Sequence, residues 1–101
     1  MKNVSITNTE NELSVTLSGE IDASNADEFF NEVSEAFSAE PKDVHLCCAD
    51  LTFIDSTTLG AIVKLFKRVR AENKNLRLSA VQPRIKKLFS ICALDKIMEI
   101  N

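Results

Sequence analysis

Hydrophobic and polar side chains alternate in two segments near the start of the chain, residues 4–6 and 13–17. A period of two residues is typical of a β-strand with one buried and one solvated face. The polar stretch at residues 8–11 between them predicts the turn of an antiparallel hairpin. The alternation then breaks at residues 19–22.

Spacings of three and four residues follow, and these predict amphipathic helices. The first helix opens at Ser24, with Asp27 three residues later in a pattern similar to a capping box, and it finishes before Pro41. Its apolar positions are Ala26, Phe29, Phe30, Val33, Ala36 and Phe37. The other side of this helix is acidic and is expected to face solvent, although it also suits a basic partner.

The stretch from Val44 to Ala49 is almost continuously apolar, which predicts a central strand covered on both faces. Asp55 or Ser56 then caps the longest helix, because a short side-chain oxygen there accepts hydrogen bonds from free N–H groups. The apolar stripe of that helix is Leu59, Ile62, Val63, Phe66 and Val69. Truncation of Phe66 to alanine is expected to lower the free energy of unfolding by about 3–5 kcal/mol.

A strand over residues 76–80 and a helix beginning at Pro83 follow. This helix has Ile85, Leu88, Phe89 and Cys92 on one face. Residues 94–100 form either a short helix or a terminal strand. The order is therefore β-β-α-β-α-β-α, in one domain of residues 1–101. We predict an α/β fold with an α+β-like start, in which a mixed β-sheet is flanked by α-helices.

Charge is divided unevenly along the chain. Residues 1–55 contain twelve acidic and two basic side chains, residues 56–101 contain ten basic and three acidic ones, and the net charge is −3. Nucleic-acid binders commonly interleave aromatic and basic residues, but Phe66 and Phe89 fall on apolar helix faces, so no nucleic-acid partner is expected. No apolar run reaches the roughly 18 residues of a membrane span, and no signal-peptide core is present, so we expect a cytoplasmic protein.

The cysteine pattern does not predict a metal centre. Cys47 and Cys48 are adjacent, Cys92 is isolated, and no C-x-x-C motif occurs. His45, the only histidine, shares strand parity with Cys47, but both lie in the apolar run and are expected to pack in the core. Neither a metal nor another cofactor is expected.

A carboxylate and three hydroxyl groups lie where the central strand meets the longest helix, at Asp55, Ser56, Thr57 and Thr58. A helix N-terminus favours negative charge and offers unpaired N–H groups to an added phosphate. The local chemistry by itself favours a well-capped helix with no further role, because Asp and Ser are common capping residues.

Four segments in order along the chain are Gly19-Glu20-Ile21-Asp22, Leu51-Thr52-Phe53-Ile54-Asp55-Ser56-Thr57, Pro83-Arg84-Ile85-Lys86-Lys87-Leu88-Phe89 and Leu94-Asp95-Lys96-Ile97. Together they resemble the STAS-domain family and, more narrowly, the bacterial anti-sigma factor antagonists. The resemblance spans essentially all 101 residues. It implies a STAS-type mixed β-sheet flanked by α-helices, and a regulator of transcription that acts by protein–protein interaction and is not an enzyme.

The resemblance also implies partners and a switch. Such antagonists bind an anti-sigma factor that is also a serine kinase, which supplies the ATP, and so release the sigma factor. The kinase inactivates them by phosphorylating the serine that follows the Asp at the helix start, which here is Ser56. A Ser/Thr phosphatase is implied as a further partner. By the same motifs, Asp22, Asp55, Thr57 and Thr58 are expected to contribute to partner binding.

The chain departs from the family motif D-S-[ST]-G-L-G at one position. Thr58 replaces the first glycine, whereas Gly60 is retained. A β-branched side chain is bulkier than glycine. The resemblance therefore implies extra bulk where a partner must approach closely, which is expected to hinder phosphorylation by a typical kinase.

Three other functions match parts of the pattern. A STAS interaction module that is never phosphorylated would serve another signalling or transport complex. An enzyme built on Asp22, Asp55 and the hydroxyl groups lacks a nearby His or Lys cluster and a glycine-rich phosphate loop. An aspartyl-phosphate receiver would use Asp22, Asp50 and Asp55, but the hairpin start argues against that fold. We therefore favour the phosphorylation switch.

Overall fold

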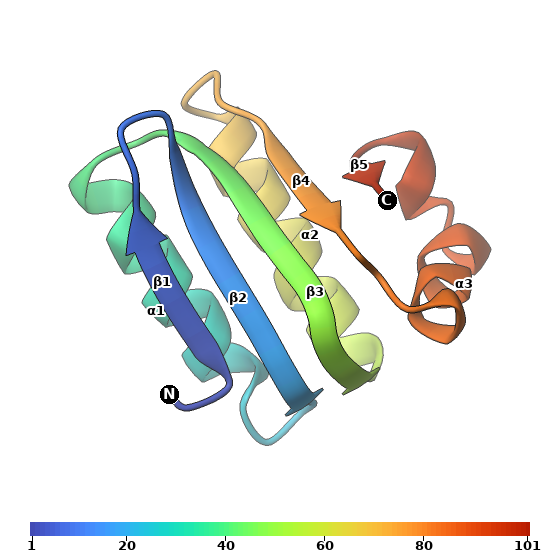
Figure 1. Ribbon diagram of the computed structural model, residues 1–101. Coiled ribbons are helices and arrows are strands. Elements are labelled where there is room, and N and C mark those ends of the chain that lie inside the picture. The colour runs from blue at the N-terminus through green and yellow to red at the C-terminus, as the bar shows by residue number, and fades with distance from the viewer.

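A computed structural model describes all 101 residues. A five-stranded sheet has the order β1-β2-β3-β4-β5 (Figure 1). Its strands are β1 (Val4–Asn8), β2 (Glu12–Ile21), β3 (Asp43–Ile54), β4 (Leu76–Ser79) and β5 (Glu99–Ile100). The helices are α1 (Ala26–Ala39), α2 (Ser56–Arg70), α3 (Pro83–Ile91) and the short 3₁₀ helix η1 (Leu94–Lys96). β1 is antiparallel to β2, and all other neighbouring strands are parallel.

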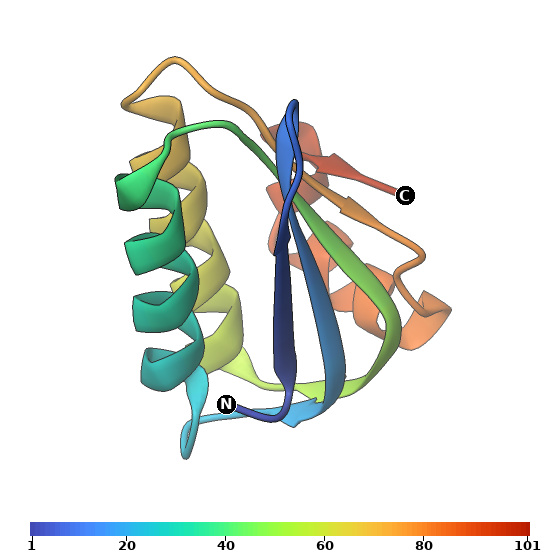
Figure 2. The same ribbon diagram turned by 60° about the vertical axis from the view of Figure 1, so that its left-hand side comes forward.

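The helices are divided between the two faces of the sheet. α1 and α2 lie side by side on one face, and α3 and η1 lie on the other (Figure 2). α1 supplies the crossover from β2 to β3, and α2 supplies the crossover from β3 to β4, as parallel neighbours require. The predicted fold class, a mixed sheet flanked by helices, is confirmed.

The predicted hairpin is present between β1 and β2. Val4 lies opposite Leu17, and Ile6 lies opposite Val15. Val4, Val15 and Leu17 are buried, and Ile6 packs against the same core. The alternating positions therefore place their apolar side chains on one face of the hairpin, as the period of two predicts.

Strand β2 does not stop where the alternation breaks, but continues to Ile21. Two register shifts against β3 accommodate the irregularity, as β-bulges do. Gly19 has a φ of +68°, in the left-handed region that glycine adopts without strain. Asn3 Nδ2 donates to the carbonyl oxygen of Ser18 at 2.7 Å and holds the bend. The longer strand carries the chain to the edge of the sheet where the candidate site lies.

Only one face of the central strand β3 is fully covered. Val44, Leu46 and Cys48 are buried. His45 and Cys47, which point to the opposite face, are only half-buried. The predictions that β3 is covered on both faces and that His45 and Cys47 belong to the core are therefore wrong, because the short C-terminal helices cover that second face only in part.

The start of α1 differs from the prediction. The helix begins at Ala26, and the residue that precedes it, Asn25, makes no side-chain capping hydrogen bond. Ser24 does not cap the helix, because its hydroxyl group donates to Asp22 Oδ1 at 2.6 Å instead. The capping-box interpretation of Ser24 is thus wrong, since the local loop provides a closer acceptor.

The buried face of α2 is rotated from the predicted stripe. Its buried residues are Thr58, Ala61, Ile62, Leu65 and Val69. Leu59, Val63 and Phe66 are half-buried and lie on the flanks. Ile62 and Val69 are therefore buried as predicted, whereas Ala61 and Leu65, which the predicted stripe did not include, also belong to the buried face.

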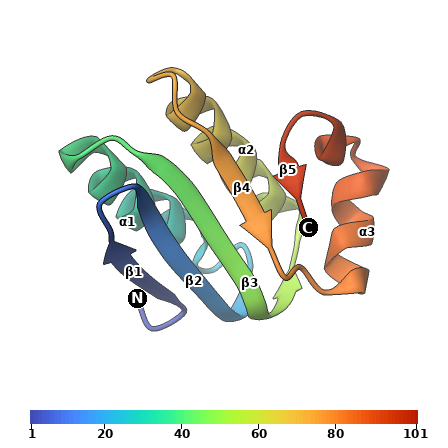
Figure 3. The ribbon, with the colours of Figure 1, turned by 45° about the horizontal axis from the view of Figure 1, so that its top comes forward.

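The C-terminal segment contains both elements that the sequence left open, because η1 is followed by β5 beside β4 (Figure 3). In α3, Ile85 and Phe89 are buried as predicted. Cys92, predicted on the apolar face, is exposed because α3 ends at Ile91. None of the helices combines the length and the apolar character that crossing a membrane requires.

Candidate functional site

The candidate site lies where β2 and β3 end at the same edge of the sheet. The two strands are parallel, and their last residues, Ile21 and Ile54, lie opposite each other. Asp22 follows the first strand and Asp55 follows the second, so the fold brings the two acidic segments together. The Ala23 N–H donates to Asp55 Oδ2 at 3.0 Å and joins the loop after β2 to the start of α2.

Asp55 is the N-cap residue of α2, one of the two candidates that the sequence offered. Its Oδ1 atom accepts a hydrogen bond from the Thr58 N–H at 3.0 Å, and its Oδ2 atom accepts the one from Ala23. The Thr58 backbone hydrogen bond, opposed by partial burial and reinforced by the Ala23 amide, holds the pKa of the Asp55 carboxyl below its ordinary value. Asp55 therefore remains a carboxylate that bridges loop and helix.

Asp22 organises the loop rather than the helix. Its Oδ1 atom accepts hydrogen bonds from the Ser24 N–H at 2.9 Å and from the Ser24 hydroxyl group. The Asp22 N–H donates to Asn25 Oδ1 at 2.8 Å, and Asn25 Nδ2 donates to the carbonyl oxygen of Glu20 at 3.1 Å. Residues 20–25 thus form a tight turn that is hydrogen-bonded within itself.

Thr58 points into the protein and away from solvent. It is the single buried polar residue of the chain, with 1% of its surface exposed. Its hydroxyl group donates to the carbonyl oxygen of Ile21, at the end of β2. It also closes a capping box with Asp55, because the Asp55 N–H donates to Thr58 Oγ1. The expected extra bulk at the docking surface is therefore absent, since the side chain is enclosed by the protein.

Ser56 and Thr57 occupy the first two positions of α2 and are exposed. Neither hydroxyl group makes a hydrogen bond within the protein. They therefore lie free at a helix N-terminus, where the helix dipole and unpaired N–H groups favour negative charge. Of the hydroxyl groups predicted for the site, these two are available to an outside reactant.

Gly60 lies one helical turn after Ser56 on the same face of α2. A Cβ atom added there would meet nothing within 4 Å. Its backbone is not left-handed, because the single glycine with a positive φ is Gly19. Neither packing nor conformation within the chain therefore requires glycine at this helical position.

Phe53 is a feature of the site to which the sequence pattern assigned no role. It is 46% exposed and lies two residues before Asp55, next to Glu20 of β2. Its neighbour Ile54 is buried, so Phe53 points to the opposite face of the sheet. A register shift lies between Leu51, which is buried, and Phe53, so the strand parity of the sequence does not identify Phe53 as exposed. An exposed aromatic ring two residues before Asp55 suits a protein partner.

A second polar cluster lies on the half-covered face of the sheet. His45 Nε2 is 2.5 Å from Ser79 Oγ, and His45 Nδ1 is 3.7 Å from Glu12 Oε1. Arg77 Nη2 contacts Glu12 Oε2 at 3.4 Å. No three His, Cys, Asp or Glu side chains are grouped to hold a metal ion. His45 lies near the start of β3, whereas Ser56 follows its end, so this histidine cannot act as a base for Ser56.

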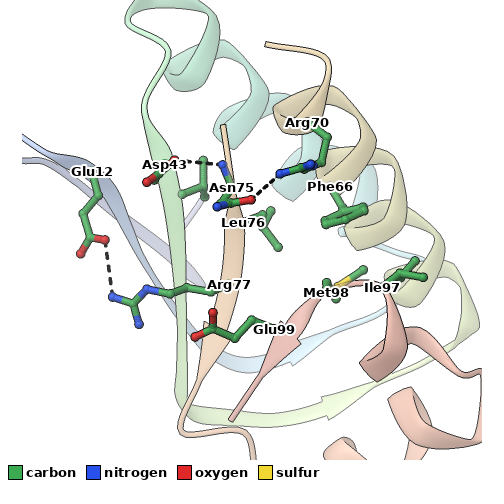
Figure 4. A pocket seen from close by; sticks show the side chains of 11 residues that line it. Glu12, Asp43, Phe66, Arg70, Asn75, Leu76, Arg77, Ile97, Met98 and Glu99 are labelled. Carbon is green, nitrogen blue, oxygen red and sulfur yellow. Dashed lines mark hydrogen bonds and ion pairs between the residues drawn. The ribbon is translucent and has the colours of Figure 1, made fainter. Parts of the chain in front are cut away.

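A cavity of about 480 Å³ lies at the other end of α2 (Figure 4). Phe66 and Met98 contribute apolar surface, and the rim carries Arg70, which donates to Asn75 Oδ1. Asn75 N–H in turn donates to Asp43 Oδ1 at 2.9 Å. The polar groups on the rim are thus paired with one another, and the cavity is separated from Ser56 by the length of the helix.

Comparison with known proteins places this geometry in a family. The family model for the STAS domain matches residues 3–101. The chain belongs to the STAS-domain family. It is 32% identical over 99 residues to the anti-sigma-B factor antagonist of Bacillus subtilis, a match that covers 98% of this chain and 90% of that protein.

Solved structures share the fold. The unphosphorylated form of SpoIIAA, an anti-sigma factor antagonist, matches with a TM-score of 0.84 and 19% identity over 97% of this chain and 87% of that one. The phosphorylated form of this Bacillus cell fate determinant matches with a TM-score of 0.76 and 19% identity, over 97% and 90% of the two chains. At this identity, the two structures support the fold.

Proposed function

We propose that this protein is an anti-sigma factor antagonist controlled by phosphorylation at Ser56. Unmodified, it binds an anti-sigma factor with serine kinase activity and so releases the sigma factor; phosphorylated, it does not. The observation that carries the proposal is the free, exposed hydroxyl group of Ser56 at the first position of α2, next to the capping carboxylate of Asp55. The curated relative named an anti-sigma-B factor antagonist supports the class of function.

The surroundings of Ser56 suit a switch that leaves the fold intact. A phosphate adds roughly −1.5 to −2 charges at neutral pH. The start of α2 partly stabilises this charge, and Ser56 makes no side-chain hydrogen bond that modification would break. Asp55 and Asp22 lie at the same edge of the sheet, so the modified surface becomes strongly anionic. A misplaced like charge at an interface costs several kcal/mol, so we expect partner affinity to fall at least a hundredfold.

The docking surface that we propose consists of the exposed groups around Ser56. Thr57 lies beside it, Gly60 leaves bare helix backbone one turn further on, and Phe53 offers an aromatic ring. Asp22 and Asp55 contribute by holding the loop and the helix start in place. Thr58 is buried and contributes to partner binding only indirectly, through its hydrogen bond to the end of β2. Because Ser56 is exposed, a Ser/Thr phosphatase would have access to remove the phosphate.

The test is incubation with the kinase-type anti-sigma factor and ATP, followed by intact mass and fragment mapping. We expect one phosphate at Ser56, and a loss of affinity after modification. Ser56→Ala should bind permanently and resist modification, and Ser56→Asp should weaken binding only in part, because it carries one charge. Absence of modification, together with unchanged affinity in Ser56→Asp, would contradict the proposal and leave an unphosphorylated STAS module of another complex.

A further inference from the structure

We propose that Thr58 is a positioning residue, which locks the loop after β2 onto the start of α2 and so presents Ser56 on a preformed surface. The sequence suggested the reverse, that Thr58 obstructs the partner. The structural half of the inference stands on contacts within the chain. The functional half rests on the proposed function.

Thr58 makes contacts on both sides of the junction. Its hydroxyl group donates to the carbonyl oxygen of Ile21, the last residue of β2. Thr58 Oγ1 also accepts from the Asp55 N–H at 3.4 Å, and the Thr58 N–H donates to Asp55 Oδ1 at 3.0 Å. Asp55 Oδ2 then accepts from the Ala23 N–H at 3.0 Å. Thr58 and Asp55 thus hold the end of β2 at Ile21 and the loop that follows it at Ala23.

The hydroxyl group has one proton and two acceptors within reach. Thr58 Oγ1 is also 3.1 Å from Asp55 Oδ1, but the Ile21 carbonyl oxygen is the closer acceptor. Ile21 lies in a fully buried position. Without the hydroxyl group its carbonyl oxygen loses this partner in a region closed to water, and unsatisfied buried acceptors are unfavourable. The bond to Ile21 is therefore the one that anchors the loop.

A glycine at position 58 would keep the N–H that donates to Asp55 Oδ1, but it would supply neither the hydrogen bond to the Ile21 carbonyl oxygen nor the one from the Asp55 N–H. The loop would then depend on the Asp55–Ala23 bond and on its own turn, both of which are exposed to solvent. A loop that is ordered before binding loses less conformational freedom when a partner docks. We therefore expect Thr58 to raise the affinity of the partner and the rate of Ser56 phosphorylation, although its side chain touches no partner atom.

The first experiment measures amide hydrogen exchange in the free protein. In Thr58→Val, which keeps the shape but removes the hydroxyl group, the Ala23 amide should exchange about tenfold faster than in the wild type. Thr58→Ser should restore protection, and Thr57→Val, the same change at an exposed neighbour, should leave it unaltered. Equal protection of Ala23 in wild type and Thr58→Val would overturn the inference. Should Thr58→Val not fold, Thr58→Ala gives the same comparison in a smaller side chain.

The second experiment measures partner affinity and phosphorylation rate for the same proteins. Thr58→Val should lose about tenfold in affinity, which corresponds to ~1.4 kcal/mol, because its loop is less ordered before binding. Thr58→Ser should recover this affinity. Thr7→Val, an exposed change on β1, is the control. If Thr58→Val binds the partner as tightly as the wild type does, the functional half of this inference is overturned, and the proposed function still stands. Failure of the wild type to bind would overturn the proposed function, while amide exchange still decides the role of Thr58.

Discussion

Replacement of Gly60 by alanine should stabilise the protein and weaken its partner complex at the same time. Glycine inside a helix is less favourable than alanine by about 0.5–1 kcal/mol. The added Cβ atom would meet nothing within 4 Å, so no steric term opposes this gain. The melting temperature of a domain of this size should therefore rise by about 2–8 °C.

The binding effect has the opposite sign because the methyl group would occupy the face that carries Ser56. Overpacking at a close contact costs about 1–3 kcal/mol, which lowers affinity by about 5- to 150-fold. Calorimetric melting and titration with the anti-sigma factor measure the two effects separately. Asn31→Ala, an exposed change on α1, is the control that improves helix propensity away from the site. Destabilisation by Gly60→Ala, or unchanged affinity, would refute the reasoning.

Three further predictions concern stability and thiol chemistry. In urea denaturation, Leu65→Ala should cost about 3–5 kcal/mol, because Leu65 is fully buried. Phe66→Ala should cost only about 1–2 kcal/mol, less than the sequence suggested, because Phe66 is half-buried beside an existing cavity. Equal losses would contradict this ranking. Asp55 has a lowered pKa, so the stability that its carboxylate gives to the fold is present above the ordinary pKa of 3.8 and is lost as pH falls through the folded value. The stability of Asp55→Asn should therefore vary less with pH in this acid range, and thermal melts at several pH values measure the difference. Burial raises the pKa of the Cys48 thiol to about 12, so at pH 8 a thiol reagent should modify the exposed Cys92 long before Cys48. Peptide mapping measures the order of modification, and modification of Cys48 before Cys92 would contradict this prediction.

Periodicity and local chemistry determined much of this protein from the sequence alone. The two period-2 segments produced the β1–β2 hairpin, and the place of Asp55 and Ser56 before an apolar helical pattern reduced the helix cap to these two residues, of which Asp55 is the cap. Pro83 marked the first turn of α3. These features depend on neighbouring residues in the chain, so their signals are local. The motif resemblance added the family, which the match over residues 3–101 bears out.

The tertiary structure decided which way particular side chains face. An apolar run cannot reveal that His45 and Cys47 lie on a half-covered face, because coverage depends on where α3 packs. The spacing of α2 was compatible with two neighbouring stripes, and contact with the sheet and α1 selected the one centred on Leu65.

Thr58 shows the difference most clearly. In the sequence it directly follows two other hydroxyl residues, Ser56 and Thr57, and in that context it looks like a surface residue. The parallel pairing of β2 with β3 brings the Ile21 carbonyl oxygen, 37 positions away in the chain, into reach of its hydroxyl group. The sequence, with its family resemblance, thus identified most of the residues that gather at this edge of the sheet, although not Phe53. Only the packing of two distant strand ends determined that Ser56 and Thr57 face outward and Thr58 inward, because the acceptor that turns Thr58 inward comes from a different strand.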